Sequence, residues 1–508
     1  DENEWKKLYK TNIDYFIETA ISGNATDYDI ASILVYMYKG DFMCVGKSKS
    51  YKWFKFEKNR WKEINGEVAI ARIISEQLYD KLQDKMFNII NLLHNYPGGS
   101  DSEGYKNLES KVAILNKMCQ YCKDRTHKMK ILGEVRDMFH DEYFLKQKDM
   151  NNYLLGFDNG IFDFNENRFR PGYHEDYMTK GTNYKYIPMD IIKTQYQEEE
   201  QEIRTFFDQI YPIKEMNDYM WNLLASLLIG GNMNQEFYMF IGNGSNGKSM
   251  VIKLLEDIMG DYFGSLPSSC ITGARPKPGQ VSPEVIALKG TRVAVINEPK
   301  RDETLNDGIV KEMTGNTDKV QGRALYGDPD SFIPQFKPIV ATNVTYNIND
   351  TTDGIWRRIK KINHISKFED KPNLKNENEF QKDKSLSKRF TKWAPVLMTL
   401  LIEIAIKTRG EITTPQIIID ETLAYKNKQD LVSEFINSRI QFEEGGKIKK
   451  TPLFGEYKLH LDRNTKKSEL EELEEAMNKK FGEYDNKKKC WKNVKLIYES
   501  DEDDEDDE

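Results

Sequence analysis

One glycine-rich stretch, FIGNGSNGKS (Phe240 to Ser249), constrains the fold of this chain more than any other segment. It has the G-x-x-x-x-G-K-[ST] spacing, in which glycines let the backbone curl so that successive N–H groups point at phosphate oxygens. Such a loop lies between a buried strand and the N-terminus of a helix. The flanking segments, EFYMFIG before it and KSMVIKLLEDIMGDYFG after it, have those two patterns. The sequence therefore predicts an α/β domain built around a phosphate-binding loop.

The loop residues have separate predicted roles. Lys248 is expected to reach the β and γ phosphates of ATP, and the hydroxyl of Ser249 is expected to coordinate Mg²⁺. A glycine turn that carries a lysine by chance is the alternative, and the flanking strand and helix patterns disfavour it. The predicted nucleotide-binding residues of the loop are Gly242, Asn243, Gly244, Ser245, Asn246, Gly247, Lys248 and Ser249.

A second apolar strand, TRVAVINEP (Thr291 to Pro299), ends in a carboxylate. An ATPase needs such a group to activate water and help hold the metal, so Glu298 is the predicted general base and, with Ser249, a metal ligand. Asn297 stands where many such enzymes have an aspartate, and we count it among the nucleotide-binding residues. The alternative is that Glu298 only caps a turn.

Two further segments carry candidate catalytic residues. The strand KPIVATN ends in Asn343, whose amide could hold the attacking water beside the carboxylate strand, although such asparagines are also ordinary turn residues. The segment DGIWRRIKKI contains Arg357 and Arg358, one of which we expect to act on the nucleotide of a neighbouring subunit. A basic strand that faces solvent is the competing interpretation of these arginines.

Composition excludes some classes of protein. A length of 508 residues predicts about three domains. The sequence has no long apolar run and no leader, so we expect a protein that neither spans a membrane nor is secreted. The last ten residues carry nine acidic groups, so the net charge of −8 becomes +1 without this tail, which we expect to be disordered. Because the chain begins at Asp1, we expect it to be part of a longer protein.

Five cysteines in so long a chain predict a reducing compartment and no disulfide framework. Cys119 and Cys122 form a C-x-x-C pair inside an amphipathic helix expected from Lys111 to His127, and a zinc site would need a second pair that the sequence lacks. Buried structural thiols are therefore expected.

The N-terminal part shows aromatic hairpins among helices. The segment Tyr51 to Ile64 predicts two strands around Lys58 and Asn59, and the segment Tyr153 to Gly172 predicts a strand, a turn at Asp158 to Gly160 and another hairpin. Aromatic and basic residues interleave in the first hairpin, as in a platform for single-stranded nucleic acid, but any half-buried hairpin has the same pattern and we favour that interpretation.

The C-terminal part predicts three helices and a basic hairpin, the arrangement of a winged helix. Thr451 is the expected cap of one helix, a capping box at Ser468 opens another that stops at Gly482, and Tyr484 to Ile497 is the expected hairpin. Because the third helix is acidic, we expect any DNA contact of this module to come from Lys487 to Lys489, with protein contact as the alternative.

Together, the phosphate loop, VAVINEP, PQFKPIVATN and DGIWRRI resemble the superfamily 3 helicases, and specifically the poxvirus-type primase-helicase family of large DNA viruses and phages. The segments SPEVIALKGTRVAVINEP, MTGNTDKVQGRALYGD and GFDNGIFDF strengthen the resemblance, which extends from about residue 25 to 365. It implies an α/β P-loop (AAA+-like) core between an α+β N-terminal domain and a helical, winged-helix C-terminal region. The implied divisions are residues 1–200, 201–365, 366–428 (linker and helix), 429–498 and 499–508.

The resemblance also implies a function. Members form hexameric rings that use ATP to move along single-stranded DNA at a replication fork, inside an infected cell or a bacterial cytosol. It assigns catalytic roles to Lys248, Glu298, Asn343 and, by position before isoleucine, Arg358. A hairpin in the ring channel would contact DNA through Lys319, Arg323, Tyr326 and Lys337. Family members often carry a primase domain, for which this chain has no room. Either the chain is the helicase portion of a larger protein, or the primase is a separate chain and an expected partner along with other replication proteins.

Two other functions fit the same residues. One is a P-loop ATPase that packages or remodels DNA without unwinding it. The other is a scaffold whose ATPase only controls assembly at an origin or with a primase.

Overall fold

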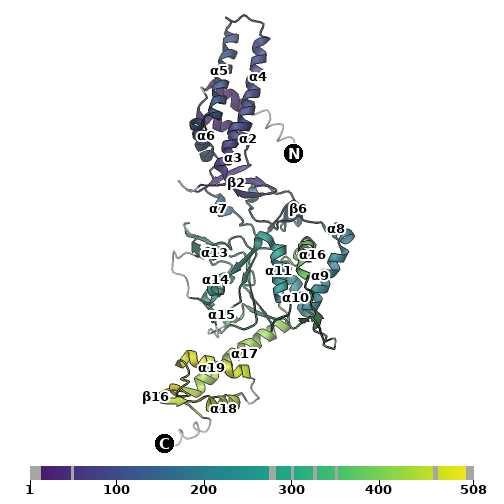
Figure 1. Cartoon of the computed structure of the whole chain (residues 1–508), viewed down its shortest axis with the longest axis vertical. Helices are drawn as coiled ribbons and strands as arrows, with labels where there is room; N and C mark the ends of the chain where they lie inside the picture. Colours follow the sequence, from purple (N-terminus) through teal and green to yellow (C-terminus); the bar gives the residue numbers. More distant parts are fainter. Residues whose placement is uncertain are drawn as a thin grey trace. The chain divides into compact units, whose positions relative to one another are not determined.

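The computed structural model describes residues 13–23, 25–46, 51–273, 282–298, 303–323, 329–348, 353–373, 375–461 and 467–498 (Figure 1). The chain divides into two compact units, Asp1–Tyr186 and Ile187–Glu508. The predicted boundary at residue 200 therefore falls inside a helix of the second unit. The reason is packing: the ring of Phe206 in that helix makes edge-to-face contacts with Phe390 and Trp393 farther along the same unit.

The first unit combines a helical layer with two small antiparallel sheets. Its strands are β1 (Phe42–Val45), β2 (Lys52–Glu57), β3 (Arg60–Ile64), β4 (Leu154–Phe157), β5 (Gly160–Asp163) and β6 (Arg168–Arg170), in the orders β1-β2-β3 and β4-β5-β6. Its helices are α2 (Asp27–Met37), α3 (Gly66–Ile73), the π-helical turn η1 (Ile74–Leu78), α4 (Tyr79–His94), α5 (Glu103–Lys123), α6 (Arg125–Met138), α7 (Phe144–Gln147) and the 3₁₀ turn η2 (His174–Asp176).

Both predicted hairpins of this unit are confirmed. Lys58 and Asn59 have φ of +51° and +66°, the left-handed pair that a two-residue hairpin turn requires, and they join β2 to β3. Phe157 pairs with Gly160 across the second turn. Trp53, Phe54 and Trp61 are each at most 3% exposed, so the aromatic residues of the first hairpin serve the core, as the half-buried interpretation predicts.

Cys119 and Cys122 lie on the buried face of α5, which starts and ends a few residues before the predicted helix. Burial raises the pKa of the Cys119 thiol to about 11 and that of Cys122 to about 12, so both are protonated at neutral pH. In the described ranges no three His, Cys, Asp or Glu side chains gather as a metal site. Nor does any described helix have the length and apolarity needed to cross a bilayer.

The second unit contains a five-stranded parallel sheet in the order β13-β7-β12-β9-β8. These strands are β7 (Phe237–Ile241), β8 (Phe263–Leu266), β9 (Val293–Ile296), β12 (Lys337–Thr342) and β13 (Ile359–Asn363). Short apolar runs form them because both faces of the sheet are covered by helices. Figure 1 shows α10, α11 and α16 on one side of the sheet and α13, α14 and α15 on the other.

The helices that flank this sheet are α8 (Met189–Gln195), α9 (Gln197–Ile210), α10 (Lys214–Ser226), α11 (Lys248–Met259), the turn η3 (Gly260–Tyr262), α12 (Ser269–Thr272), α13 (Pro283–Ile286), α14 (Asp307–Thr314), α15 (Asp353–Trp356) and α16 (Phe390–Thr408). The short strands β10 (Val320–Arg323) and β11 (Pro329–Phe332) form an antiparallel pair before β12. The α/β core that the sequence predicts is present.

The polar run after β13, which we predicted to be a loop or linker, is ordered. It contains β14 (Lys367–Glu369), β15 (Glu379–Gln381) and the turn η4 (Leu386–Arg389), and β14 pairs with β15 in parallel. We call residues 366–373 and 375–389 the strap. The amide of Phe368 donates a hydrogen bond of 2.7 Å to the carbonyl of Ser245 in the phosphate loop. The polar run is thus a loop with two short strands, and it is attached to a distant part of the chain.

The C-terminal module contains α17 (Gln416–Arg439), β16 (Ile440–Ile448), α18 (Lys450–His460), α19 (Lys467–Phe481) and β17 (Trp491–Leu496). Strand β17 pairs with β16, so the predicted hairpin within Tyr484–Ile497 is reduced to one bridge between Asp485 and Cys490. Helix α18 begins at Lys450, so Thr451 lies inside it and is not the cap we predicted. The capping box predicted at Ser468 lies outside the described side chains. The predicted end of α19 before Gly482 is confirmed.

Candidate functional site

The candidate site lies at the carboxyl ends of β7, β9 and β12, three neighbouring strands of the parallel sheet. Ligands of such sheets bind at this edge, where chain connections leave in opposite directions. The phosphate loop joins β7 to α11, so the predicted strand, loop and helix are all present. Gly244 and Gly247 have φ of +86° and +82°, which a residue with a side chain rarely adopts.

Crowding in the loop explains why position 242 is a glycine. A Cβ atom on Gly242 would lie 1.9 Å from the side-chain nitrogen of Asn246 and 2.9 Å from the carbonyl of His364. That nitrogen of Asn246 is buried and has no hydrogen-bond partner in the described part of the chain. An unpaired buried donor is costly, and a bound anion would satisfy it. The loop therefore fits a phosphate group.

Lys248 is the first residue of α11, and its ammonium group is held by three oxygen atoms. It donates hydrogen bonds to the carbonyl of Gly242 (2.6 Å), to Oδ1 of Asn246 (3.0 Å) and to Oδ1 of Asn343 (2.9 Å). Burial lowers the pKa of Lys248, and the negative charge of Glu298 opposes that effect. Among the described residues, Lys248 has no ion-pair partner in direct contact, so its charge is available to bind an anion.

Glu298 and Asn343, from two neighbouring strands, are also brought together here. The backbone amide of Asn343 donates a hydrogen bond of 3.2 Å to Oε1 of Glu298. Asn297 and Glu298 are both exposed after β9, and the amide of Asn297 bonds the carbonyl of Leu266 at 2.9 Å. The hydroxyl-bearing side chain of Ser249 is exposed beside Lys248. Residues that sequence analysis grouped by motif therefore meet at one site.

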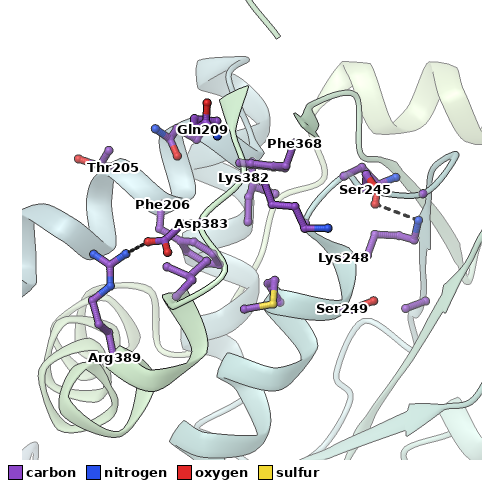
Figure 2. Close-up of a pocket in the computed structure, with 18 of the residues that line it drawn as sticks. Thr205, Phe206, Gln209, Ser245, Lys248, Ser249, Phe368, Lys382, Asp383 and Arg389 are labelled. Carbon is purple, nitrogen blue, oxygen red and sulfur yellow. Dashed lines mark hydrogen bonds and ion pairs between the residues drawn. The ribbon is translucent and has the colours of Figure 1, made fainter. Parts of the chain in front are cut away.

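A cavity of about 820 Å³ opens beside the loop. Figure 2 shows its walls: α9 supplies Thr205, Phe206 and Gln209, and the strap supplies Phe368 and Lys382. Sequence analysis missed all of these residues, because the strap has the composition of a loop and α9 has the pattern of any amphipathic helix.

A polar cluster forms part of the cavity lining. Arg389 pairs with Glu202 at 2.8 Å and with Asp383, and the indole nitrogen of Trp393 donates to the other carboxylate oxygen of Glu202 at 2.8 Å. These bonds fix the end of the strap and the start of α16 against α9.

The two candidate arginines differ in their surroundings. Arg358 is only 9% exposed and bonds Thr314 at 3.1 Å and Gln235 at 3.0 Å. Burial lowers its pKa, and Arg357 adds to that effect. Arg357 is exposed and bonds Gln235 at 2.6 Å. The structure is thus at odds with our choice of Arg358 for contact with a neighbouring subunit, since that guanidinium is committed to its own chain.

The four predicted DNA contacts do not share one environment. Lys319 is exposed before β10, Arg323 is half-buried at the end of that strand, and Tyr326 lies outside the described residues. Lys337 is buried and donates to the carbonyls of Ser226 and Gly231, both at 2.9 Å.

The prediction for Lys337 was therefore wrong. Burial lowers its pKa to about 7, and the charge of Arg292 adds to that effect. Because this lysine begins a central strand, its side chain is enclosed by the sheet and the chain segment before β7, and it cannot reach a nucleic acid. Its ammonium group instead binds two backbone carbonyls of its own chain.

Comparison with known proteins adds an independent observation. Residues 31–212 match a protein-family model described as D5 N terminal like. A protein of Acanthamoeba polyphaga mimivirus named "Putative helicase L207/L206" is 32% identical over 449 residues, which cover 87% of this chain and 46% of that protein. The chain belongs to the helicase and primase family of large DNA viruses.

Other members of this viral family are more distant. The Invertebrate iridescent virus 6 protein "Putative helicase 184R" is 26% identical over 82% of this chain and 47% of that protein. "Putative primase C962R" of African swine fever virus (isolate Pig/Kenya/KEN-50/1950) is 24% identical over 82% of this chain and 45% of its own length. The chain thus spans about half the length of these relatives.

Two solved structures were also compared with the structure of this chain. The C-terminal region of NrS-1 has a TM-score of 0.41 at 11% identity and covers 80% of this chain and 78% of that one. JCV helicase has a TM-score of 0.26 at 10% identity and covers 71% of this chain and 93% of that one. At these TM-scores neither overlap supports an assignment of the site.

Proposed function

We propose that this chain is the motor part of an ATP-dependent replicative DNA helicase of superfamily 3. The observation that carries the proposal is the meeting of Lys248, Glu298 and Asn343 at the carboxyl ends of three parallel strands, beside a loop with an unpaired buried donor. This is the set of groups that phosphoryl transfer requires: a cradle for phosphates, a carboxylate and an amide. The names of the viral relatives, helicase and primase, fit this chemistry.

In this proposal, Lys248 and the loop amides bind the β and γ phosphates, which leaves the γ-phosphate near the ends of β9 and β12. Glu298 accepts a proton from the attacking water, and the side chain of Asn343 orients that water. The oxygen atoms of Ser249 and Glu298 fit Mg²⁺, which prefers a few protein oxygens together with phosphate and water. When bound, Mg²⁺ neutralises phosphate charge.

The wider architecture follows from the same proposal. The core is a P-loop (AAA+-like) ATPase, the first unit is a collar, and the C-terminal module with its β16–β17 sheet is winged-helix-like. The working form is a homo-hexamer on single-stranded or forked DNA, with a primase among its partners. We place Arg357, the more exposed arginine, at the nucleotide of the neighbouring subunit.

Ring assembly gives a first prediction. If Arg357 completes the site of a neighbour, the rate of ATP hydrolysis per subunit should rise with protein concentration as rings form. The measurement is steady-state hydrolysis over a dilution series, with the Arg357→Ala variant beside it. That variant should keep a low rate at every concentration. A rate per subunit that is independent of concentration, in a preparation shown to dissociate on dilution, would rule out an arginine that acts between subunits.

The β10–β11 hairpin gives a second prediction, which separates a motor from a scaffold. Lys319→Ala combined with Arg323→Ala should weaken binding to single-stranded DNA, reduce the salt slope of binding by about 0.7 per lost phosphate contact, and stop unwinding of a fork. Basal ATP hydrolysis should persist, because neither residue lies at the phosphate loop.

The matched control for the hairpin variant is Lys214→Ala, which removes an exposed lysine of α10 paired with Asp218. Its DNA binding and unwinding should equal those of the unmodified chain. Unwinding that survives the double hairpin substitution would contradict the channel role. Hydrolysis without any unwinding by the unmodified chain would favour the packaging or scaffold function.

A further inference from the structure

The strap places one lysine over the nucleotide site. Its start is fixed to the phosphate loop, because Phe368 donates its amide to Ser245, and its two short strands pair in parallel. The amide of Lys382 then donates a hydrogen bond of 2.9 Å to the carbonyl of Glu369. The main chain at Lys382 is therefore held in place by the same strand that contacts the loop.

The side chain of Lys382 differs from those of its neighbours. Lys367 pairs with Glu369 at 2.9 Å, and Lys384 pairs with Asp370 at 3.0 Å. Lys382 forms no ion pair within the described ranges, although it lines the cavity. Figure 2 shows its side chain extending from the strap toward Ser245 and Lys248.

Within the described ranges, none of the acidic groups that line the cavity forms an ion pair with this lysine. The carboxylates of Glu202 and Asp383 are both bound by Arg389. Glu298, at the opposite side, accepts the amide of Asn343. The remaining acidic residue in the lining, Glu198, is exposed on the first turn of α9. Lys248 and Lys382 therefore line one cavity as two cations without a directly bonded carboxylate in the described ranges, and a polyanion between them would attract both.

We propose that Lys382 binds the phosphate chain of the nucleotide held by the same subunit, as a second cation beside Lys248. This inference rests on the proposed function, since it takes a nucleoside triphosphate as the ligand. Charge-assisted hydrogen bonds between lysine and phosphate are among the stronger polar contacts. Because the strap also continues through η4 into α16, the same contact ties the strap to the occupied site.

The test is equilibrium binding of the full chain to ATP, inorganic tripolyphosphate and adenosine, measured by displacement of a fluorescent ATP analogue. Lys382→Ala should weaken binding of ATP and tripolyphosphate about tenfold and leave adenosine unchanged. Lys382→Arg should restore most of the affinity, because it keeps the positive charge. Lys388→Ala, which removes another exposed lysine of the strap that does not line the cavity, should match the unmodified chain.

The outcomes are distinguishable. An equal loss for adenosine, an equal loss in Lys388→Ala, or unchanged ATP binding in Lys382→Ala would each overturn the inference while leaving the ATPase proposal intact. Thermal melting without ligand should be the same for all three variants, and a lower melting temperature for Lys382→Ala alone would also overturn it in favour of a structural role. Failure of the unmodified chain to bind ATP would contradict the proposed function and this inference together.

Discussion

Replacing Lys248 by alanine is expected to lower the rate of ATP hydrolysis by about 1000-fold, the scale of losing one positioned group that stabilises transition-state charge. The ammonium group of Lys248 is held by oxygen atoms of Gly242 and Asn246 in the loop and of Asn343 after β12. Without this ammonium group, the three oxygen atoms would face the negatively charged phosphates with no cation between them. Steady-state hydrolysis, with nucleotide binding measured in parallel, provides the test.

The matched control for this variant is Lys253→Ala, one turn farther along α11, where the lysine is half exposed and pairs with Glu256 and Asp257. It should hydrolyse ATP normally, because its charge is already compensated and it does not line the cavity. Hydrolysis by Lys248→Ala at a rate close to that of Lys253→Ala would mean that the loop does not serve a nucleotide.

Replacing Glu298 by glutamine is expected to lower the rate of hydrolysis by about 100-fold to 10,000-fold while ATP still binds, which is the range for loss of a general base. Glutamine has the same shape, and its carbonyl oxygen can still accept the amide of Asn343, but it cannot take a proton from water. The variant should therefore trap ATP. Single-turnover hydrolysis and nucleotide retention measured on one preparation separate the two effects.

Glu256→Gln is the corresponding control for Glu298, since Glu256 is an exposed carboxylate on α11 and its only described partner is Lys253. Loss of binding and hydrolysis in equal measure in Glu298→Gln would show that the carboxylate holds the nucleotide and does not act as a base.

Short sequence motifs predicted the parts of the fold that depend on residues adjacent in the sequence. The turn at Lys58 and Asn59 needs two left-handed residues in sequence, and the hairpin follows from them. The phosphate loop could also be predicted locally, because its glycines, its lysine and the start of the following helix are adjacent in the sequence. Glu298 and Asn343 are distant in sequence, but each follows a buried strand, and parallel strands end at a common edge.

The failures depend on contacts that sequence does not display. Lys337 looks like a basic residue at a strand end, and only its neighbours in the sheet show that it is enclosed. The attachment of the strap to the phosphate loop comes from a backbone bond to Ser245, which composition does not indicate. In the C-terminal module, Thr451 and Pro452 lie inside the first turn of α18, where a proline is also tolerated because the N–H groups there lack helical partners.

The central claim is that ATP hydrolysis at this site drives strand separation, and the most direct measurement is unwinding of a forked duplex alongside hydrolysis with and without single-stranded DNA. The unmodified chain should unwind the fork and hydrolyse ATP faster when DNA is present, and Lys248→Ala should do neither. Fork unwinding that persists in Lys248→Ala would contradict the claim. So would a hydrolysis rate of the unmodified chain that is the same with and without DNA, together with no unwinding of the fork.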